Sequence, residues 1–316
     1  MKVLVTGGAG FIGSHLVERL LQRKYQIVCL DNFNTYYDPA IKQRNIQTAL
    51  ANPGYKLVTG EILDKPLLCN LFQEHEFNLV VHLAARAGVR PSIQEPLLYE
   101  QVNVQGTMNL LEMCRVHDIK KFVFASSSSV YGANTKVPFA ETDPVDNPVS
   151  PYAATKKAGE LVCYTYNHLY DISVNCLRFF TVYGPRQRPD MAIHKFANLI
   201  FHGKPIPVFA QGKSKRDYTF IEDILDGIIG AMDNCNGYGI YNLGESRTVE
   251  LLYLIELIQE KMGKKAQLEL MPAQPGDVPI TYADISHARQ NLNYNPHVDI
   301  VQGVEAFVDW YLSVNK

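Results

Sequence analysis

Short apolar runs alternate with amphipathic stretches through the first half of the chain. The runs are rich in β-branched residues and have strand length, at 2–6, 26–31, 55–60, 78–84, 121–126 and 173–179. Between them apolar residues recur at helical spacing, which predicts helices near 12–23, 65–76, 98–117 and 152–170. Because the strands are almost continuously apolar, we expect a parallel sheet covered by helices on both faces. Right-handed crossovers then give a doubly wound α/β fold that binds ligands at the carboxyl ends of its strands.

The second half is less regular and is punctuated by proline, which predicts a smaller mixed α/β domain over one edge of the sheet. Helices are expected near 190–202, 221–233, 248–262 and 301–313. We therefore assign 1–180 to the sheet domain and 181–316 mainly to a substrate-binding cap. Segments near 215–245 are expected to return to the sheet domain, so the boundary is discontinuous in sequence.

The composition is that of an ordinary globular protein. The 316 residues carry a formal net charge of −2 and are 47% hydrophobic, so no charge excess indicates a nucleic-acid or membrane-surface partner. No apolar run approaches the length of a membrane span. The six cysteines are far apart and form no CxxC pair, which favours buried free thiols over disulfides or a metal site. We expect a soluble, cytoplasmic protein without a metal.

A glycine-rich turn, Gly7-Gly8-Ala9-Gly10-Phe11-Ile12-Gly13, joins the first strand to the first helix. Glycines at its first, fourth and seventh positions permit a tight turn, close approach of a pyrophosphate, and close helix–strand packing. The helix N-terminus adds N–H groups and a partial positive charge. Asp31 ends the second strand, where a carboxylate accepts hydrogen bonds from a ribose 2′-hydroxyl and repels a 2′-phosphate. These features predict a Rossmann-type domain that binds NAD rather than NADP. Lys42 and Arg44 are interpreted as a solvated helix face.

The segment Tyr152-Ala153-Ala154-Thr155-Lys156 is a YxxxK pattern on a predicted helix. Residues four apart share a helix face, so the phenol and the ammonium can point into one cleft. A nearby cation, together with the positive nicotinamide, favours the phenolate and brings the tyrosine pKa toward neutral pH. The serine cluster 126–129 follows the fifth strand and places hydroxyls beside this cleft. The patterns predict a tyrosine base with a serine hydroxyl next to it. A purely structural role for the serine cluster, as a loop that caps the strand, remains the alternative.

Taken together, these motifs resemble the nucleotide-sugar epimerase branch of the extended short-chain dehydrogenase/reductase family, through essentially the whole chain. The resemblance rests on residues 7–13, 82–85, 103–107, 126–132, 152–156, 177–185 and 216–218. It implies that Tyr152, Lys156 and Ser127 are catalytic. It also implies NAD contacts from Gly7, Gly10, Phe11, Ile12, Gly13, Asp31, Asn32, Glu61, Ile62, Leu83, Ala84, Ala85, Tyr152 and Lys156. Relatives usually carry Asp where this chain has Glu61, which leaves the adenine contact open.

Sister enzymes share a first step, in which Tyr152 would remove the C4 hydroxyl proton while hydride moves to NAD. Similar 4,6-dehydratases carry an Asp-Glu pair just after the catalytic Ser/Thr, and similar decarboxylases carry a Glu two residues before Tyr131. This chain has Ser128 and Ser129 at those two positions. Because a serine cannot serve as a carboxylate acid or base, elimination is disfavoured. The resemblance therefore implies 4-epimerisation, with hydride returned to the opposite face of a rotated sugar.

Segments 31–38, 87–90 and 178–191 resemble those of UDP-glucuronate 4-epimerases. The implied reaction interconverts UDP-glucuronate and UDP-galacturonate through a 4-keto intermediate. The sugar carboxylate needs hydrogen-bond donors, and the candidates are Ser127, Ser128, Ser129, Thr181 and Arg90. By resemblance, the candidates for the uridine and diphosphate contacts are Arg188, Lys195, Arg216 and Asp277. A plain surface or structural role remains open for Arg90, Lys195 and Asp277.

Two other functions remain open from the sequence. One is a 4-epimerase of UDP-glucose or UDP-N-acetylglucosamine, and the other is a non-catalytic NAD-binding sensor, against which the intact Tyr152, Lys156 and Ser127 argue. The helices near 98–117 and 152–170 resemble the pair that forms a four-helix dimer interface in relatives, which implies a homodimer. The apolar side chains of these helices fit a monomer core equally well: Leu110, Leu111, Met113 and Leu161.

Overall fold

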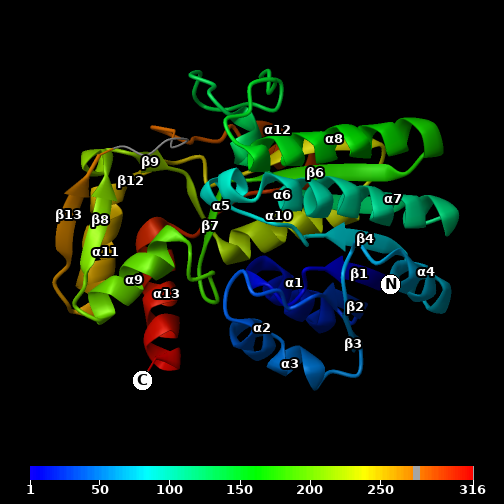
Figure 1. The fold of residues 1–316 in the computed structure, drawn as a ribbon, viewed down its shortest axis with the longest axis horizontal. Coiled ribbons are helices and arrows are strands. Elements are labelled where there is room, and N and C mark those ends of the chain that lie inside the picture. Colours follow the sequence, from blue (N-terminus) through cyan, green and yellow to red (C-terminus); the bar gives the residue numbers. More distant parts are fainter. Residues whose placement is uncertain (273–277, 316) are drawn as a thin grey trace.

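A seven-stranded parallel sheet forms the centre of the molecule (Figure 1). The structure is a computed structural model that describes residues 1–272 and 278–315. The strands are β1 (Lys2–Thr6), β2 (Gln26–Asp31), β3 (Tyr55–Thr59), β4 (Leu79–His82), β5 (Lys121–Ser127), β6 (Ser173–Phe179) and β11 (Tyr238–Leu243). Their order is β11-β6-β5-β4-β1-β2-β3, and every neighbouring pair is parallel. The order reverses between β1 and β4, which is where such sheets bind dinucleotides.

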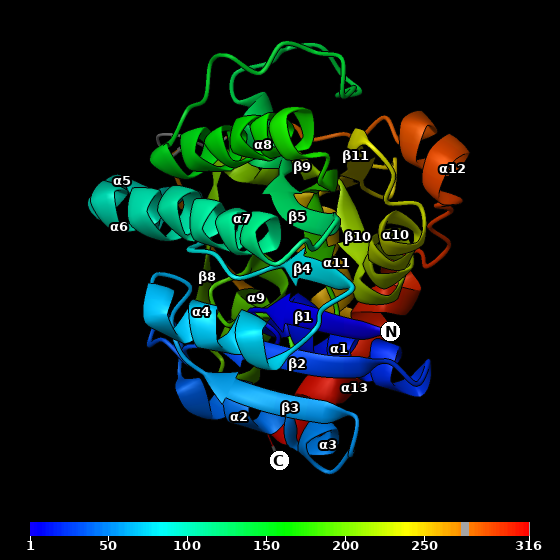
Figure 2. The same ribbon diagram turned by 90° about the vertical axis from the view of Figure 1, so that its right-hand side faces the viewer.

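Helices cover both faces of the sheet (Figure 2). One layer holds α4 (Lys65–Glu74), α7 (Gly106–Val116) and α8 (Pro151–Tyr170), and the other holds α1 (Phe11–Gln22), α10 (Ile221–Asp233) and α12 (Ser286–Leu292). Side chains alternate across β1 accordingly, because Val3 and Val5 belong to one buried cluster and Leu4 to the other. A sheet buried on both faces with crossover helices confirms the predicted Rossmann-type fold.

The cap lies beside the carboxyl ends of the strands, at the left of Figure 1. It contains α9 (Ala192–Phe201), α11 (Leu251–Met262) and α13 (Ile300–Val314). The parallel pair β8 (Pro205–Phe209) and β13 (Gln267–Met271) forms its outer edge. Two further two-stranded sheets lie outside the central sheet: β7 (Thr181–Tyr183) with β10 (Tyr218–Phe220), and β9 (Lys215–Arg216) with β12 (Val249–Glu250).

The predicted helix at 98–117 is interrupted. It consists of α6 (Pro96–Glu100), a π-helical turn η1 (Gln101–Gln105) and α7. The turn contains the buried Asn103, whose amide bonds the backbone N–H and C=O of Arg86 at 2.8 and 3.0 Å and the Thr155 hydroxyl at 3.1 Å. The wider turn therefore supplies a polar anchor beside the strand ends, a common use of π turns.

Several short elements escaped prediction, because each is about one or two helical turns long. They are α3 (Gln47–Leu50), α5 (Val89–Gln94), α12, and the 3-10 turns η2 (Ser128–Tyr131) and η3 (Ala210–Gly212). The bounds of α2 (Pro39–Asn45) were not predicted either, although a helix face was expected at Lys42 and Arg44. All six cysteines are free thiols, and five of them are buried. Within the described residues, no helix is both long and apolar enough to cross a bilayer.

Candidate active site

A cavity of about 350 Å³ opens at the carboxyl ends of the central strands, where the strand order reverses. It is lined from the loops after β1, β2, β3, β4 and β5, from the start of α8, and from the end of β6. The whole set of expected NAD contacts lies on its wall: Gly7, Gly10, Phe11, Ile12, Gly13, Asp31, Asn32, Glu61, Ile62, Leu83, Ala84, Ala85, Tyr152 and Lys156. The fold thus gathers the expected contacts, from Gly7 to Lys156, around one space.

The glycine-rich loop is shaped so that side chains are excluded at two positions. Gly7 has a φ of +70°, and a Cβ on it would lie 2.7 Å from the Ala84 nitrogen. A Cβ on Gly13 would lie 2.2 Å from the Gly7 carbonyl oxygen. Both obstacles are backbone atoms, so neither can swing away. The loop therefore keeps its backbone open to a ligand at the N-terminus of α1, and this arrangement suits the pyrophosphate of NAD.

Asp31, the last residue of β2, has three polar partners in the structure. Its carboxylate accepts hydrogen bonds from the backbone N–H groups of Ala9 (3.1 Å) and Phe33 (2.9 Å). The Lys42 ammonium lies 3.4 Å from the same carboxylate. The acid therefore links the glycine-rich loop to the loop after β2, and it retains lone pairs for a ribose hydroxyl.

Interpreting Lys42 as part of a solvated helix face was wrong, because the residue is only 5% exposed. Asn45, three residues further along α2, donates a hydrogen bond to the Ala9 carbonyl at 3.2 Å. That bond turns one face of α2 toward the glycine-rich loop, and Lys42 lies on this face. Lys42 also lies 5.4 Å from the centre of the Tyr37 ring. The cavity thus pairs a cation with the acid expected to select the cofactor.

The position after β3 is occupied by Glu61 and Ile62, and both line the cavity. The Asn32 amide donates a hydrogen bond to the Glu61 carboxylate at 2.8 Å. This bond connects the exposed Glu61 side chain to the loop after β2. An acidic group is therefore present at this end of the cavity.

Helix α8 begins immediately before the predicted base. The Ser150 hydroxyl accepts a hydrogen bond from the Ala153 N–H at 3.1 Å, and Pro151 occupies the first turn, so the helix start is fixed. Tyr152 and Lys156 both face the cavity, as their spacing predicts. The Lys156 ammonium donates a hydrogen bond to the Ala125 carbonyl at 2.7 Å, and burial lowers the pKa of Lys156 to about 8.

The electrostatics at Tyr152 differ in one respect from those expected. Burial raises the pKa of the Tyr152 phenol, while a hydrogen bond with Ser127 and the charge of Arg188 act in the opposite direction. Arg188, from the loop after β7, is thus a cation that favours the phenolate, whereas the Lys156 ammonium is held at the Ala125 carbonyl. A positive charge from bound nicotinamide would add to the effect of Arg188.

The candidate substrate residues fall into two groups. Ser127, Ser128, Ser129, Thr181 and Arg188 line the cavity, and the Ser127 hydroxyl accepts a hydrogen bond from the Ser129 N–H at 3.1 Å. Three others lie outside its lining. Arg90 lies 5.0 Å from the Phe209 ring centre, Lys195 is exposed on α9, and Arg216 donates to the Lys215 carbonyl at 2.9 Å. Asp277 lies outside the described residues.

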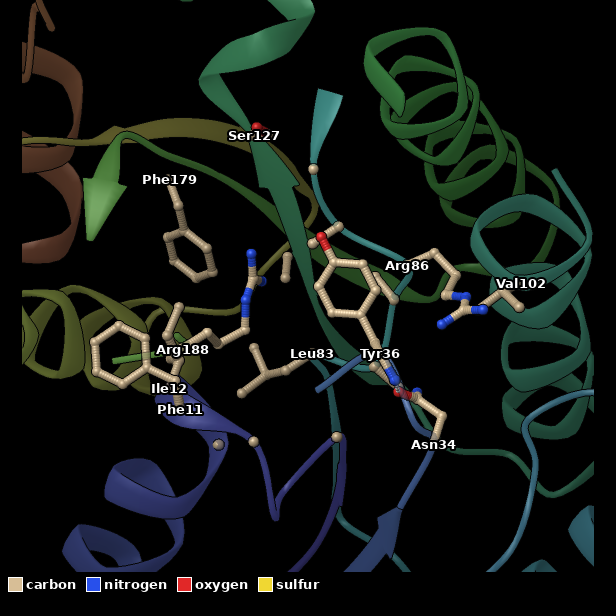
Figure 3. Close-up of a pocket in the computed structure, with 18 of the residues that line it drawn as sticks. Phe11, Ile12, Asn34, Tyr36, Leu83, Arg86, Val102, Ser127, Phe179 and Arg188 are labelled. Atoms are coloured by element: carbon tan, nitrogen blue, oxygen red, sulfur yellow. Dashed lines mark hydrogen bonds between the residues drawn. The ribbon is translucent and has the colours of Figure 1, made fainter. Parts of the chain in front are cut away.

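Sequence reasoning did not single out Tyr36, which stands at the centre of the cavity wall (Figure 3). The Tyr36 ring lies between two guanidinium groups, with Arg188 at 5.6 Å and Arg86 at 5.8 Å from its centre. Asp190 holds Arg188 through two hydrogen bonds of 3.0 and 2.9 Å. The loops after β2, β4 and β7 meet here, and nothing in their separate sequences shows this contact.

Comparison with known proteins agrees with this geometry. Residues 3–244 match the profile of the NAD dependent epimerase/dehydratase family. UDP-glucuronate 4-epimerase 1 of Arabidopsis thaliana is 44% identical over 333 residues, which cover 99% of this chain and 77% of the plant protein.

Solved structures show the same relationship. The UDP-glucuronic acid 4-epimerase of Bacillus cereus, in complex with UDP-glucuronic acid and NAD, is 37% identical with a TM-score of 0.93, covering 99% of this chain and 100% of that one. The UDP-glucose 4-epimerase of Thermotoga maritima, with UDP-glucose, is 30% identical with a TM-score of 0.91 and full coverage of both chains. The resemblance predicted from the motifs is therefore confirmed, and the chain belongs to the NAD dependent epimerase/dehydratase family.

Proposed function

We propose that this chain is a UDP-glucuronate 4-epimerase that keeps NAD bound through the reaction. The observation that carries the proposal is the single cavity in which Tyr152, Ser127 and Lys156 face both the glycine-rich loop and an arc of hydroxyls. Relatives with this activity at 44% identity, and a structural neighbour solved with UDP-glucuronic acid and NAD, support it.

The chain's own residues provide the acid–base chemistry. Bound NAD supplies the hydride acceptor, and in the return step the hydride donor, at sugar C4. Tyr152 takes the proton of the C4 hydroxyl, and its hydrogen bond with Ser127 orients the phenol. Arg188 adds a positive charge that favours the phenolate. After the 4-keto sugar has turned its other face, Tyr152 returns the proton to the C4 oxygen.

Hydroxyls rather than carboxylates flank this part of the cavity. Ser128 and Ser129 follow Ser127 directly, and Thr181 lies on the neighbouring wall. None can act as the acid or base of an elimination near neutral pH, which leaves epimerisation as the outcome. For the nucleotide we propose contacts from Arg188, Lys195 and Arg216, because guanidinium and ammonium groups suit phosphates. The free thiols suit a reducing compartment, and we place the reaction in the cytoplasm.

The carboxylate of the substrate sets a further requirement. A 4-keto glucuronate is a β-keto acid, which loses carbon dioxide when its carboxylate bond aligns with the π system of the ketone. Hydroxyl donors at Ser128 and Thr181 can fix the plane of the carboxylate away from that alignment. The arc of hydroxyls therefore protects the intermediate as well as binding the substrate.

Replacing Thr181 or Ser128 with alanine is expected to raise the UDP-pentose side product about tenfold relative to the epimer, because the freed carboxylate samples the aligned geometry. Products are quantified by liquid chromatography from UDP-glucuronate. Ser313→Ala, at an exposed position of α13, is the matched control and should leave the ratio unchanged. Parental product ratios in both cavity variants would remove this role for the hydroxyls.

We also propose that the protein is a homodimer formed through α7 and α8, which lie side by side (Figure 1). Leu161 on α8 is 57% exposed, and Met108, Val116 and Leu169 on the same two helices are exposed as well. Leu110 and Leu111 are completely buried, so they belong to the core. A row of exposed apolar side chains on two adjacent helices is suited to an interface with a second copy.

A Leu161→Glu substitution is expected to shift the protein from dimer to monomer, because two carboxylates would be buried near the symmetry axis of the interface. Analytical ultracentrifugation measures the mass directly. Leu268→Glu, on the exposed side of β13, is a matched control that should stay dimeric. A parental protein that sediments as a monomer would refute the dimer.

The substrate assignment is tested by side-by-side turnover of UDP-glucuronate, UDP-glucose and UDP-N-acetylglucosamine with no NAD added. Structural neighbours include epimerases of the two neutral sugars, so the comparison is a direct one. We expect NMR to show UDP-galacturonate formed from UDP-glucuronate at least tenfold faster than either neutral epimer is formed. Faster turnover of a neutral sugar would assign the chain to that substrate instead.

A further inference from the structure

Helix α8 is fastened to the end of β5 by three polar side chains that follow one another at intervals of four. Tyr152 hydrogen bonds with Ser127. Lys156 donates to the Ala125 carbonyl at 2.7 Å, and Glu160 accepts a hydrogen bond from the Ser126 hydroxyl at 2.6 Å. Because residues four apart share one helix face, the three contacts form a ladder along α8. The first two rungs belong to the cavity, whereas Glu160 is completely buried and does not line it.

Glu160 forms a buried ion pair. Arg178 on β6 donates two hydrogen bonds to its carboxylate, at 2.8 and 2.9 Å, and is itself 1% exposed. Arg178 is the register partner of Ser126 in the sheet, so the pair lies directly beneath the end of β5. Lys157, on α8 itself, lies 3.3 Å from the second carboxylate oxygen. The bidentate contact between Arg178 and Glu160 fixes the position of α8 relative to β6.

The Glu160–Arg178 pair also contributes to the electrostatic environment of Lys156. On α8 the ammonium faces Glu160 and the Cys163 thiol, and burial lowers its pKa to about 8 while those two groups raise it. From β4 it faces His82, which burial and the Lys156 charge keep neutral, with a pKa of about 3. From β5 it faces the Phe124 ring, 5.1 Å away. Arg178 on β6 is the counter-ion of Glu160, and Arg188 acts on Tyr152. Glu160 thus places a carboxylate one helical turn from Lys156 on the same face of α8.

We propose that Glu160 is a positioning residue for the epimerase reaction, which holds Lys156 against the end of β5 and keeps it charged at the working pH. The inference rests on the proposed function, because it concerns the same Tyr152–Lys156 pair. Glu160 lies one helical turn beyond Lys156, in a buried ion pair with Arg178 that does not line the cavity.

The test is the pH profile of kcat for UDP-glucuronate epimerisation in the holoenzyme, between pH 6 and 10. Activity that needs the Lys156 cation is lost as pH rises through the Lys156 pKa. Glu160→Gln removes the supporting charge and lowers that pKa, so the high-pH limb is expected to move to lower pH. A displacement of about one pH unit is the size expected for one nearby charge, and it lowers the ratio of the activity at pH 8.5 to that at pH 7 about fourfold.

Two further variants separate positioning from folding. Glu160→Met/Arg178→Met replaces the whole pair with apolar side chains, which buried ion pairs generally tolerate, so it should fold even if the single variant does not. Its high-pH limb is expected to move in the same direction. Ser126→Ala removes one hydrogen bond to Glu160 without altering a charge, and its limb should stay at the parental pH even if kcat falls.

The inference would be overturned if a folded Glu160 variant that retains NAD kept the high-pH limb of its kcat profile at the parental pH. It would also be overturned if Ser126→Ala moved that limb as far as Glu160→Gln does. A parental protein that does not epimerise UDP-glucuronate would instead refute the proposed function, so the two failures are distinct.

Discussion

Replacing Tyr152 with phenylalanine is expected to lower kcat for UDP-glucuronate epimerisation about a thousandfold, within the range that a positioned general base contributes. The substitution removes only the phenolic oxygen. Tyr152 lies at the start of α8, where the Ser150 cap and Pro151 fix the backbone independently of that oxygen. The NAD content of the purified variant and its KM for UDP-glucuronate should therefore stay close to parental values. Only kcat is expected to fall.

The measurement is initial-rate turnover of UDP-glucuronate, with NAD content determined on the same preparation. Tyr311→Phe is the matched control, since it deletes a hydroxyl that donates to the Asn198 amide oxygen at 3.0 Å between α13 and α9 of the cap. That variant should turn over at the parental rate. A Tyr152→Phe enzyme that kept one tenth of the parental kcat would show that another group moves the proton.

The second large effect is expected at Asp31. Asp31→Asn removes the charge that repels a 2′-phosphate, and it keeps one of the two oxygens that now accept from the Ala9 and Phe33 N–H groups. It also leaves Lys42 without its carboxylate partner beside the ribose position. We expect the preference for NAD over NADP to fall about thirtyfold, equivalent to ~2 kcal/mol, because a charge-assisted bond is lost and a repulsion disappears.

Equilibrium binding of the two cofactors to protein stripped of nucleotide measures this ratio. Lys42→Met provides the matched control, because it removes the cation and leaves the acid. That variant should bind NAD more weakly and should gain nothing toward NADP. An Asp31→Asn protein with the parental preference would show that the carboxylate serves only to join the two loops.

The sheet and the glycine-rich loop could be predicted because their signals are local. Apolar runs of strand length, helical periodicity and three glycines at fixed spacing each lie within a few residues of one another. The ends of these strands are then brought together by the topology alone. For this reason every expected NAD contact lies on one cavity.

Contacts between loops could not be predicted in the same way. Lys42 is read as a surface residue when α2 is considered alone, and only the Asn45 bond to the glycine-rich loop turns it inward. Tyr36 reaches Arg188 across more than 150 positions of sequence, and no periodicity links them. The interruption at Gln101–Gln105 depends on what Asn103 contacts on another loop. Tertiary partners decide such features.

In the proposed reaction one bound cofactor oxidises and re-reduces the same carbon of the same sugar. UDP-glucuronate carrying deuterium at C4, incubated with the protein and no added NAD, tests this by NMR. We expect UDP-galacturonate with the deuterium retained at C4. Product with hydrogen from the solvent at C4, or no product from protein that holds its NAD, would contradict it.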